Sequence, residues 1–119
     1  MKIKTSELTG VALDWAVAKA EGYTGVALES RTGEWYTPST DWAQGGPIIE
    51  REGITLSRNE QKSFVGQQPW VSYFIEHLFT DEYEHEYQYG PTPLIAAMRC
   101  YVASKLGDEV DVPEELLCE

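Results

Sequence analysis

The sequence is poor in basic residues. Nine lysines and arginines stand against 20 acids in 119 residues, which gives a formal net charge of -11. Proteins that bind nucleic acid neutralise phosphates with clustered lysine and arginine, so this balance argues against direct nucleic-acid binding and against an anionic membrane surface. An acidic surface attracts a basic partner, and it also simply keeps a protein in solution.

Cysteines and long apolar runs are also scarce. Cys100 and Cys118 are the two cysteines of the chain. Their spacing matches neither a metal site nor a disulfide framework, and we expect reduced thiols. No stretch approaches 18 uninterrupted apolar residues, and the first residues contain no signal-peptide apolar run. These absences predict a cytosolic protein.

The length of 119 residues predicts a single domain over residues 1–119. A first helix is predicted over residues 7–21, because apolar residues between Leu8 and Trp15 recur at helical spacing. Thr5 or Ser6 can cap it. The helix is apolar on nearly all sides, so we expect it to be covered by a sheet or by a second subunit, in a homodimer or higher homo-oligomer.

A second helix is predicted over residues 93–106. Thr92 is placed to cap its start, Pro93 occupies the first helical position, and Gly107 can end it. Both predicted helices are rich in alanine, and small side chains permit close approach of two backbones. We therefore expect the N-terminal and C-terminal helices to pack on each other.

Short β-type runs lie between the two helices. Residues 24–29 and 34–36 suggest a hairpin, and further strands are predicted at 53–57 and 70–75. Residues 71–79 can alternatively form a helix. Residues 82–89 alternate as in a strand, with tyrosines and His85 on one face and acids on the other. The expected fold is α+β: a small antiparallel sheet, two packed helices and a long irregular loop in the middle.

That irregular segment spans residues 35–52 and is the most unusual part of the sequence. Pro38, Gly45-Gly46 and Pro47 interrupt any regular element. Two tryptophans, a tyrosine and many hydrogen-bonding side chains in such a loop suit a ligand pocket, where aromatic rings stack on a planar ligand and glycine backbone approaches it closely. The alternative is a loop whose tryptophans close the edge of the core and whose polar residues make local turn bonds.

Further candidates for this site come from the few cationic residues of the chain. Arg51 and Arg99 could meet an anion, and the helix start at Thr92 offers free backbone N–H groups. Ordinary ion pairs with neighbouring acids are the alternative for the arginines. The predicted ligand-binding residues are Trp35, Tyr36, Ser39, Thr40, Asp41, Trp42, Gln44, Gly45, Gly46, Arg51, Thr92 and Arg99.

Catalysis is not expected from this sequence. His77 and His85 are the two histidines, and neither falls in a pattern that makes a dyad or a metal site. Acids at residues 81–86 lack the spacing of a calcium loop and fit a solvated face. We therefore expect no enzyme, no metal and no cofactor.

Two long motifs resemble one family. Residues 39–54, residues 89–107 and the opening 4–10 are similar to the NinX-type family of small phage and prophage accessory proteins. The likeness covers nearly the whole chain and is weakest at residues 57–87. It implies a phage accessory protein acting in the bacterial host cytoplasm. Because the family has no settled biochemical activity, the resemblance implies no catalytic residues.

Two functions follow as hypotheses. In the first, the protein binds and sequesters a small planar-ring ligand, with a nucleotide immune signal as the first candidate, and so counters host defence. In the second, its acids imitate DNA or dock on a basic patch of a host nuclease, another defence protein or a replication factor. The contacts would then come from residues 82–86 and 108–115.

Overall fold

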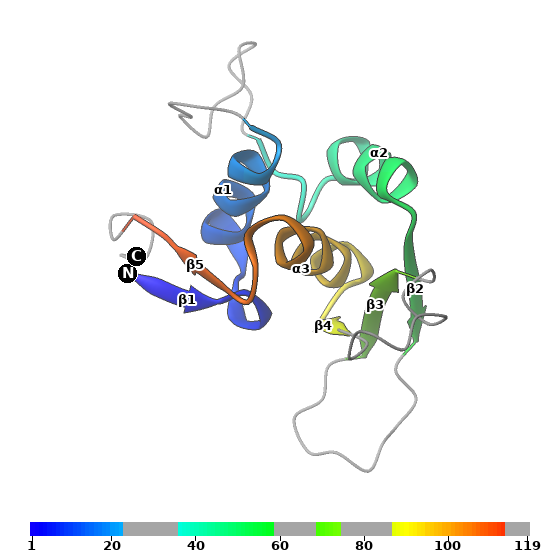
Figure 1. Cartoon of the computed structure of the whole chain (residues 1–119). Helices are drawn as coiled ribbons and strands as arrows, with labels where there is room; N and C mark the ends of the chain where they lie inside the picture. Colours follow the sequence, from blue (N-terminus) through cyan, green and yellow to red (C-terminus); the bar gives the residue numbers. More distant parts are fainter. Residues whose placement is uncertain (23–35, 59–68, 75–86, 114–119) are drawn as a thin grey trace.

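The computed structural model describes residues 1–22, 36–58, 69–74 and 87–113, and Figure 1 shows their arrangement. The elements follow one another as β1 (Lys2–Lys4), the 3-10 helix η1 (Thr5–Glu7), α1 (Gly10–Ala20), α2 (Trp42–Glu52), β2 (Ile54–Arg58), β3 (Trp70–Phe74), β4 (Gln88–Gly90), α3 (Pro93–Leu106) and β5 (Glu109–Asp111). Helices combined with small antiparallel sheets confirm the predicted α+β class.

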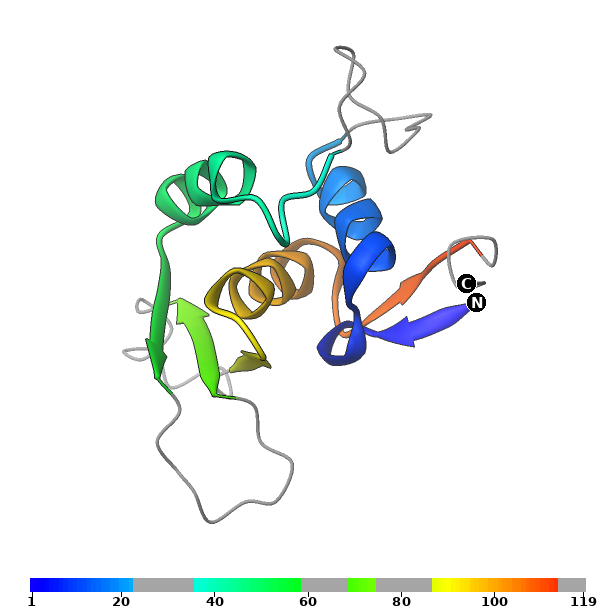
Figure 2. The same cartoon turned by 180° about the vertical axis from the view of Figure 1, so that it is seen from behind.

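Helix α3 is the centre of the molecule. It contacts α1 and α2 on one side and all three strands of the larger sheet on the other (Figures 1 and 2). Its residues from Ala96 to Val102 are all buried, so both its large-residue face and its small-residue face are covered. The predicted packing between the N-terminal and C-terminal helices is confirmed, and the apolar core lies mainly between them.

The strands form two antiparallel sheets. Strands β2, β3 and β4 make a three-stranded sheet, with Ile54 opposite Phe74 and Ser72 opposite Gln88. The buried Ser72 hydroxyl donates to the Ala96 carbonyl of α3 at 2.6 Å, which ties the sheet to the helix. The helical alternative for 71–79 is wrong at residues 71–74, which are β3. The predicted hairpin of residues 24–36 lies outside the described residues except for Tyr36, which is not in a strand.

The second sheet pairs β1 with β5. The first helix starts later in the sequence than predicted. Helix α1 begins at Gly10 after Thr9, which makes no side-chain cap bond. Thr5 belongs to η1, where it is buried and its hydroxyl donates to the Gly107 carbonyl at 2.6 Å. Thr5 is therefore unavailable as a cap because it joins the start of the chain to the end of α3.

Most of the segment that we predicted to be irregular, residues 35–52, is helix α2 in the structure. Asp41 caps its start, accepting the Ala43 N–H at 3.0 Å, and Gly53 ends it with a φ of 71°. Gly45 and Ile48 are buried, so packing holds this helix together in spite of Pro47 within it. Among the described residues, irregular backbone in this region is limited to residues 36–41.

Candidate functional site

The turn before α2 is held by a closed set of hydrogen bonds. The Asp41 carboxylate accepts from Ala43 N–H and from the Gln44 side-chain amide, both at 3.0 Å. The Gln44 side-chain oxygen in turn accepts the Thr37 N–H at 2.7 Å. Polar groups that we expected to meet a ligand therefore shape this turn, as the alternative interpretation of the loop predicts.

The buried carboxylate of Asp14, on α1, is hydrogen-bonded to the same turn. Asp14 is 5% exposed and accepts the N–H of Ser39, itself 1% exposed, at 2.9 Å. Burial raises the pKa of Asp14 above its ordinary value, and the hydrogen bonds from Ser39 oppose that rise. Asp14 was not among the predicted site residues, although it is the one acid within the alanine-rich stretch Gly10–Ala20.

Trp42 projects from the first position of α2 and is 54% exposed. It therefore does not close the core, contrary to the alternative interpretation of this loop. A side-chain carbon added at Gly46, one turn along the helix, would lie 3.8 Å from the Trp42 ring, so the indole leans along α2. Tryptophan is enriched among the residues that contribute most to binding at interfaces.

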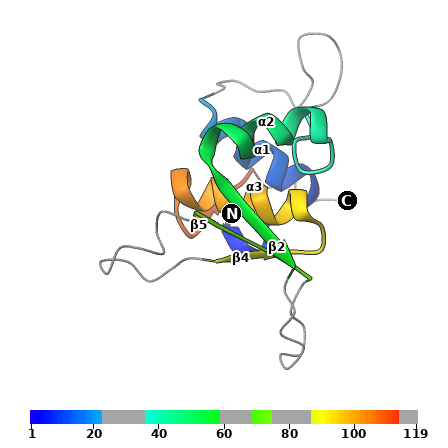
Figure 3. The ribbon, with the colours of Figure 1, turned by 90° about the vertical axis from the view of Figure 1, so that its right-hand side faces the viewer.

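Helices α2 and α3 run side by side in the same direction (Figure 3). Gly45 lies against Leu94 near the two N-terminal ends, and Arg51 lies against Tyr101 towards the C-terminal ends. Trp42 and the capped start of α3 therefore face the same edge of the molecule. Thr92 caps that start by accepting the Ile95 N–H at 3.2 Å.

Arg51 lies at the opposite end of α2 and is occupied by acids. It pairs with Glu21 at 3.0 Å and with Glu52 at 2.8 Å, and its guanidinium lies over the Tyr101 ring at 5.7 Å. Hydrogen bonds to Glu52 and Glu21 raise the pKa of Arg51. The Tyr101 hydroxyl also donates to Glu21 at 2.8 Å, and burial with this bond raises the pKa of Tyr101 to about 12. This cluster joins all three helices.

Arg99 is buried at 2% exposure and also serves the fold. Its Nε donates to the Leu8 carbonyl at 2.8 Å and its Nη1 donates to the Tyr89 carbonyl. Burial lowers the pKa of Arg99. The side chain thus connects α3 to the segment before α1 and to β4, and neither predicted arginine faces the Trp42 edge.

The other predicted residues belong to the turn and the first part of α2. Thr40 is exposed, Asp41, Gln44 and Gly46 are half-buried, and Gly45 is buried. Tyr36 packs against the hydrophobic core. Trp35 lies outside the described residues. The structure therefore brings together one compact group around Trp42, with the Thr92 helix start at the same edge.

Three further observations concern the described residues. Within them, no three histidine, cysteine, aspartate or glutamate side chains come together as metal ligands. No helix in the described part of the chain has the length and apolarity needed to cross a bilayer. Cys100, on α3, is a buried thiol.

The fold and the Trp42 edge thus define a small α+β protein with an exposed aromatic on a well-capped helix. Residues 4–105 match the family model described as Bacteriophage P22, NinX, and the chain belongs to this family. No curated protein matches the sequence.

Proposed function

We propose that this phage protein is a non-enzymatic binding protein of the host cytoplasm that sequesters a small planar-ring ligand at the surface around Trp42. The consequence would be to remove a signal on which host defence depends, and nucleotides are the first ligand class to test. The observation that supports this proposal is the exposure of the Trp42 indole, 54%, at the start of a capped helix.

The surroundings of Trp42 favour binding with little ordering cost. The turn is fixed by Asp41, Gln44 and Thr37, and its base is held by the buried pair of Asp14 and Ser39. A surface that is already ordered loses less conformational entropy when a ligand arrives. Stacking of one base on an aromatic side chain contributes roughly 1–3 kcal/mol, which is enough to make Trp42 the main contact.

The arrangement of charge limits how a nucleotide could bind. Arg51 is engaged by Glu21 and Glu52, and Arg99 is buried. Phosphate would therefore have to meet the N-terminal ends of α2 and α3, which are already capped by Asp41 and Thr92. We accordingly expect the ring to dominate, so that a nucleoside binds within about tenfold of its nucleotide, a difference of about 1.4 kcal/mol.

The first experiment identifies the ligand. The protein is purified from phage-infected cells and denatured, and the released small molecules are analysed by mass spectrometry for ultraviolet-absorbing compounds. Nucleosides and nucleotides, including any compound recovered, are then titrated by calorimetry. The proposal predicts saturable binding of at least one planar-ring compound.

Three variants then locate the site. Trp42→Ala should weaken binding about tenfold or more, because one stacked ring is lost. Trp42→Phe should retain most of the affinity. Tyr87→Ala is the matched control, since Tyr87 is another exposed aromatic, at 40%, and directly precedes β4, where its ring contacts that of Tyr73. Equal affinity of Trp42→Ala and wild type would assign the ligand to another surface.

The distribution of acids supports a second candidate, an inhibitor that docks on a basic patch of a host nuclease, defence protein or replication factor. The described residues carry nine acids and seven lysines and arginines, whereas residues 75–86 and 114–119 contain eight acids and neither lysine nor arginine. The excess negative charge is therefore concentrated in two stretches of sequence. Binding to a basic partner that falls steeply with added salt and survives Trp42→Ala would favour this candidate over ligand sequestration.

A further inference from the structure

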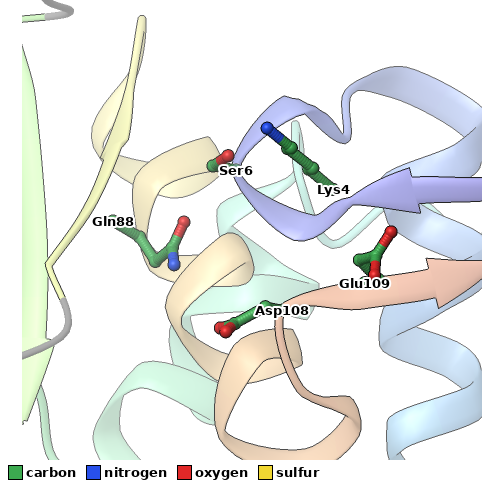
Figure 4. A pocket seen from close by; sticks show the side chains of 5 residues that line it. All are labelled: Lys4, Ser6, Gln88, Asp108 and Glu109. Atoms are coloured by element: carbon green, nitrogen blue, oxygen red, sulfur yellow. The ribbon is translucent and has the colours of Figure 1, made fainter.

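A cleft lies beneath α3, on the side away from α2, where η1, β4 and the chain after α3 meet. It has a volume of about 290 Å³ and is lined by Lys4, Ser6, Gln88, Asp108 and Glu109 (Figure 4). These residues come from distant parts of the sequence and no sequence pattern connected them. The cleft shares none of the residues of the Trp42 surface.

The cleft presents opposite charges on different walls. Figure 4 shows the Lys4 ammonium and the Ser6 hydroxyl at one side and the Asp108 carboxylate at the other. Lys4 is opposite Glu109 in the pairing of β1 with β5. Among the described residues, neither Lys4 nor Asp108 has an ion-pair partner within 4.0 Å. Both charges are therefore available to a ligand.

The side chain of Gln88 gives independent evidence that the cleft binds a ligand. Its side chain extends from β4 towards the cleft, and the residue is 8% exposed. The buried side-chain oxygen has no hydrogen-bond partner in the part of the chain that the structure describes. Buried polar atoms are rarely left in this state, and an unfilled binding site is one cause. Rotation of the amide can turn either its oxygen or its N–H₂ towards a ligand.

We propose that this cleft binds a small zwitterion of the α-amino acid class. The ligand's carboxylate would meet Lys4 and Ser6, and its ammonium would meet Asp108 and the Gln88 amide oxygen. A volume of about 290 Å³ is at the lower limit for ligand pockets, which suits an amino acid better than a nucleotide. The two carboxylates, Asp108 and Glu109, outnumber the single cation, so the ligand must carry a positive group as well as a negative one.

The test uses the whole chain and NMR of its backbone amides. The standard amino acids are titrated one at a time, together with methylammonium and acetate as fragments that carry one charge each. The proposal predicts saturable shifts at Ser6, Gln88 and Asp108 for at least one amino acid. Each fragment should bind at least tenfold more weakly than that amino acid, because it satisfies one wall only. Absence of saturable shifts for every amino acid at millimolar concentration would overturn the proposal.

Two surface variants test which residues bind the carboxylate and which bind the ammonium of the ligand. Lys4→Met and Asp108→Asn should each weaken amino acid binding about tenfold or more, as expected for loss of a charged hydrogen-bond partner. Lys2→Met is the matched control, because it removes the same charge from the same strand outside the cleft. Both test residues are exposed, so the variants should fold. Unchanged affinity in both, or a fragment that binds as well as the amino acid, would refute the assignment.

Discussion

Gly45 lies where α2 packs against Leu94 of α3 and against the turn before α2, and its replacement tests this packing. A Cβ atom at Gly45 would lie 2.7 Å from Leu94 Cδ1 and against the carbonyl oxygen of Pro38. The Leu94 side chain can move a little, but the Pro38 carbonyl belongs to the turn held by Asp41 and Gln44. Alanine at this position must therefore displace α2 from the turn that contains Pro38, in addition to crowding Leu94 of α3.

The expected magnitude comes from two opposing effects. Overpacking a well-filled site costs about 1–3 kcal/mol, and contact with fixed backbone places Gly45→Ala at the upper end. Alanine also improves helix propensity by about 1 kcal/mol. We expect a net loss of about 2 kcal/mol for Gly45→Ala. Gly46→Ala is the matched control, because its nearest new contact is an ordinary 3.8 Å from Trp42, and it should gain about 0.5–1 kcal/mol.

Thermal and urea unfolding of the two variants measure this difference. For a domain of this size about 1 kcal/mol corresponds to roughly 4 °C, so Gly45→Ala should melt about 8 °C below wild type and Gly46→Ala about 2–4 °C above it. Equal urea slopes would show that the unfolded states are comparable. A Gly45→Ala variant as stable as Gly46→Ala would refute the close packing of Gly45 against the Pro38 carbonyl and Leu94.

Further predictions concern buried polar groups and assembly. Asp14→Ala should lose about 1–3 kcal/mol because the Ser39 N–H is left buried and unpaired, whereas Asp14→Asn keeps an acceptor and should match or exceed wild type at neutral pH, both measured by urea unfolding. Because the pKa of Asp14 is raised on folding, wild type should gain stability relative to Asp14→Asn as pH falls through the folded-state pKa, and a pH-independent difference would contradict this. The pKa of Tyr101 is raised from 10.0 to about 12, so its contribution to stability is complete below pH 10 and is lost as pH rises to 12. Tyr101→Phe should flatten that decline in alkaline unfolding curves. The homodimer proposed from the apolar first helix predicts twice the monomer mass by light scattering, and a monomer mass at all concentrations would exclude it.

The sequence predicted elements whose signals are local. The α3 helix follows from Thr92, Pro93 and Gly107, and the structure confirms all three positions. Helix α2 could not be predicted in this way, because Gly45-Gly46 and Pro47 are local signals against a helix. It forms because Gly45 allows close packing on α3, a contact between residues far apart in the sequence.

The candidate site was predictable only in part. Trp42 and its neighbours were identified from composition, and the structure groups them at the start of α2. For Arg51 the structure shows the alternative that the sequence also allowed, an ion pair with the neighbouring Glu52, together with one to the distant Glu21. The carbonyl partners of Arg99 could not be predicted from composition. The cleft with Gln88 depends on the meeting of three separate segments, which no local pattern records.

The central position of α3 has a consequence for biosynthesis. A ribosome delivers α3 after α1, α2 and the three strands that it covers, and only β5 of the described elements follows it. Until α3 emerges, the earlier segments lack the helix against which they pack, so the nascent chain stays accessible to chaperones and proteases. The protein should therefore acquire its tertiary structure only after α3 has left the ribosome.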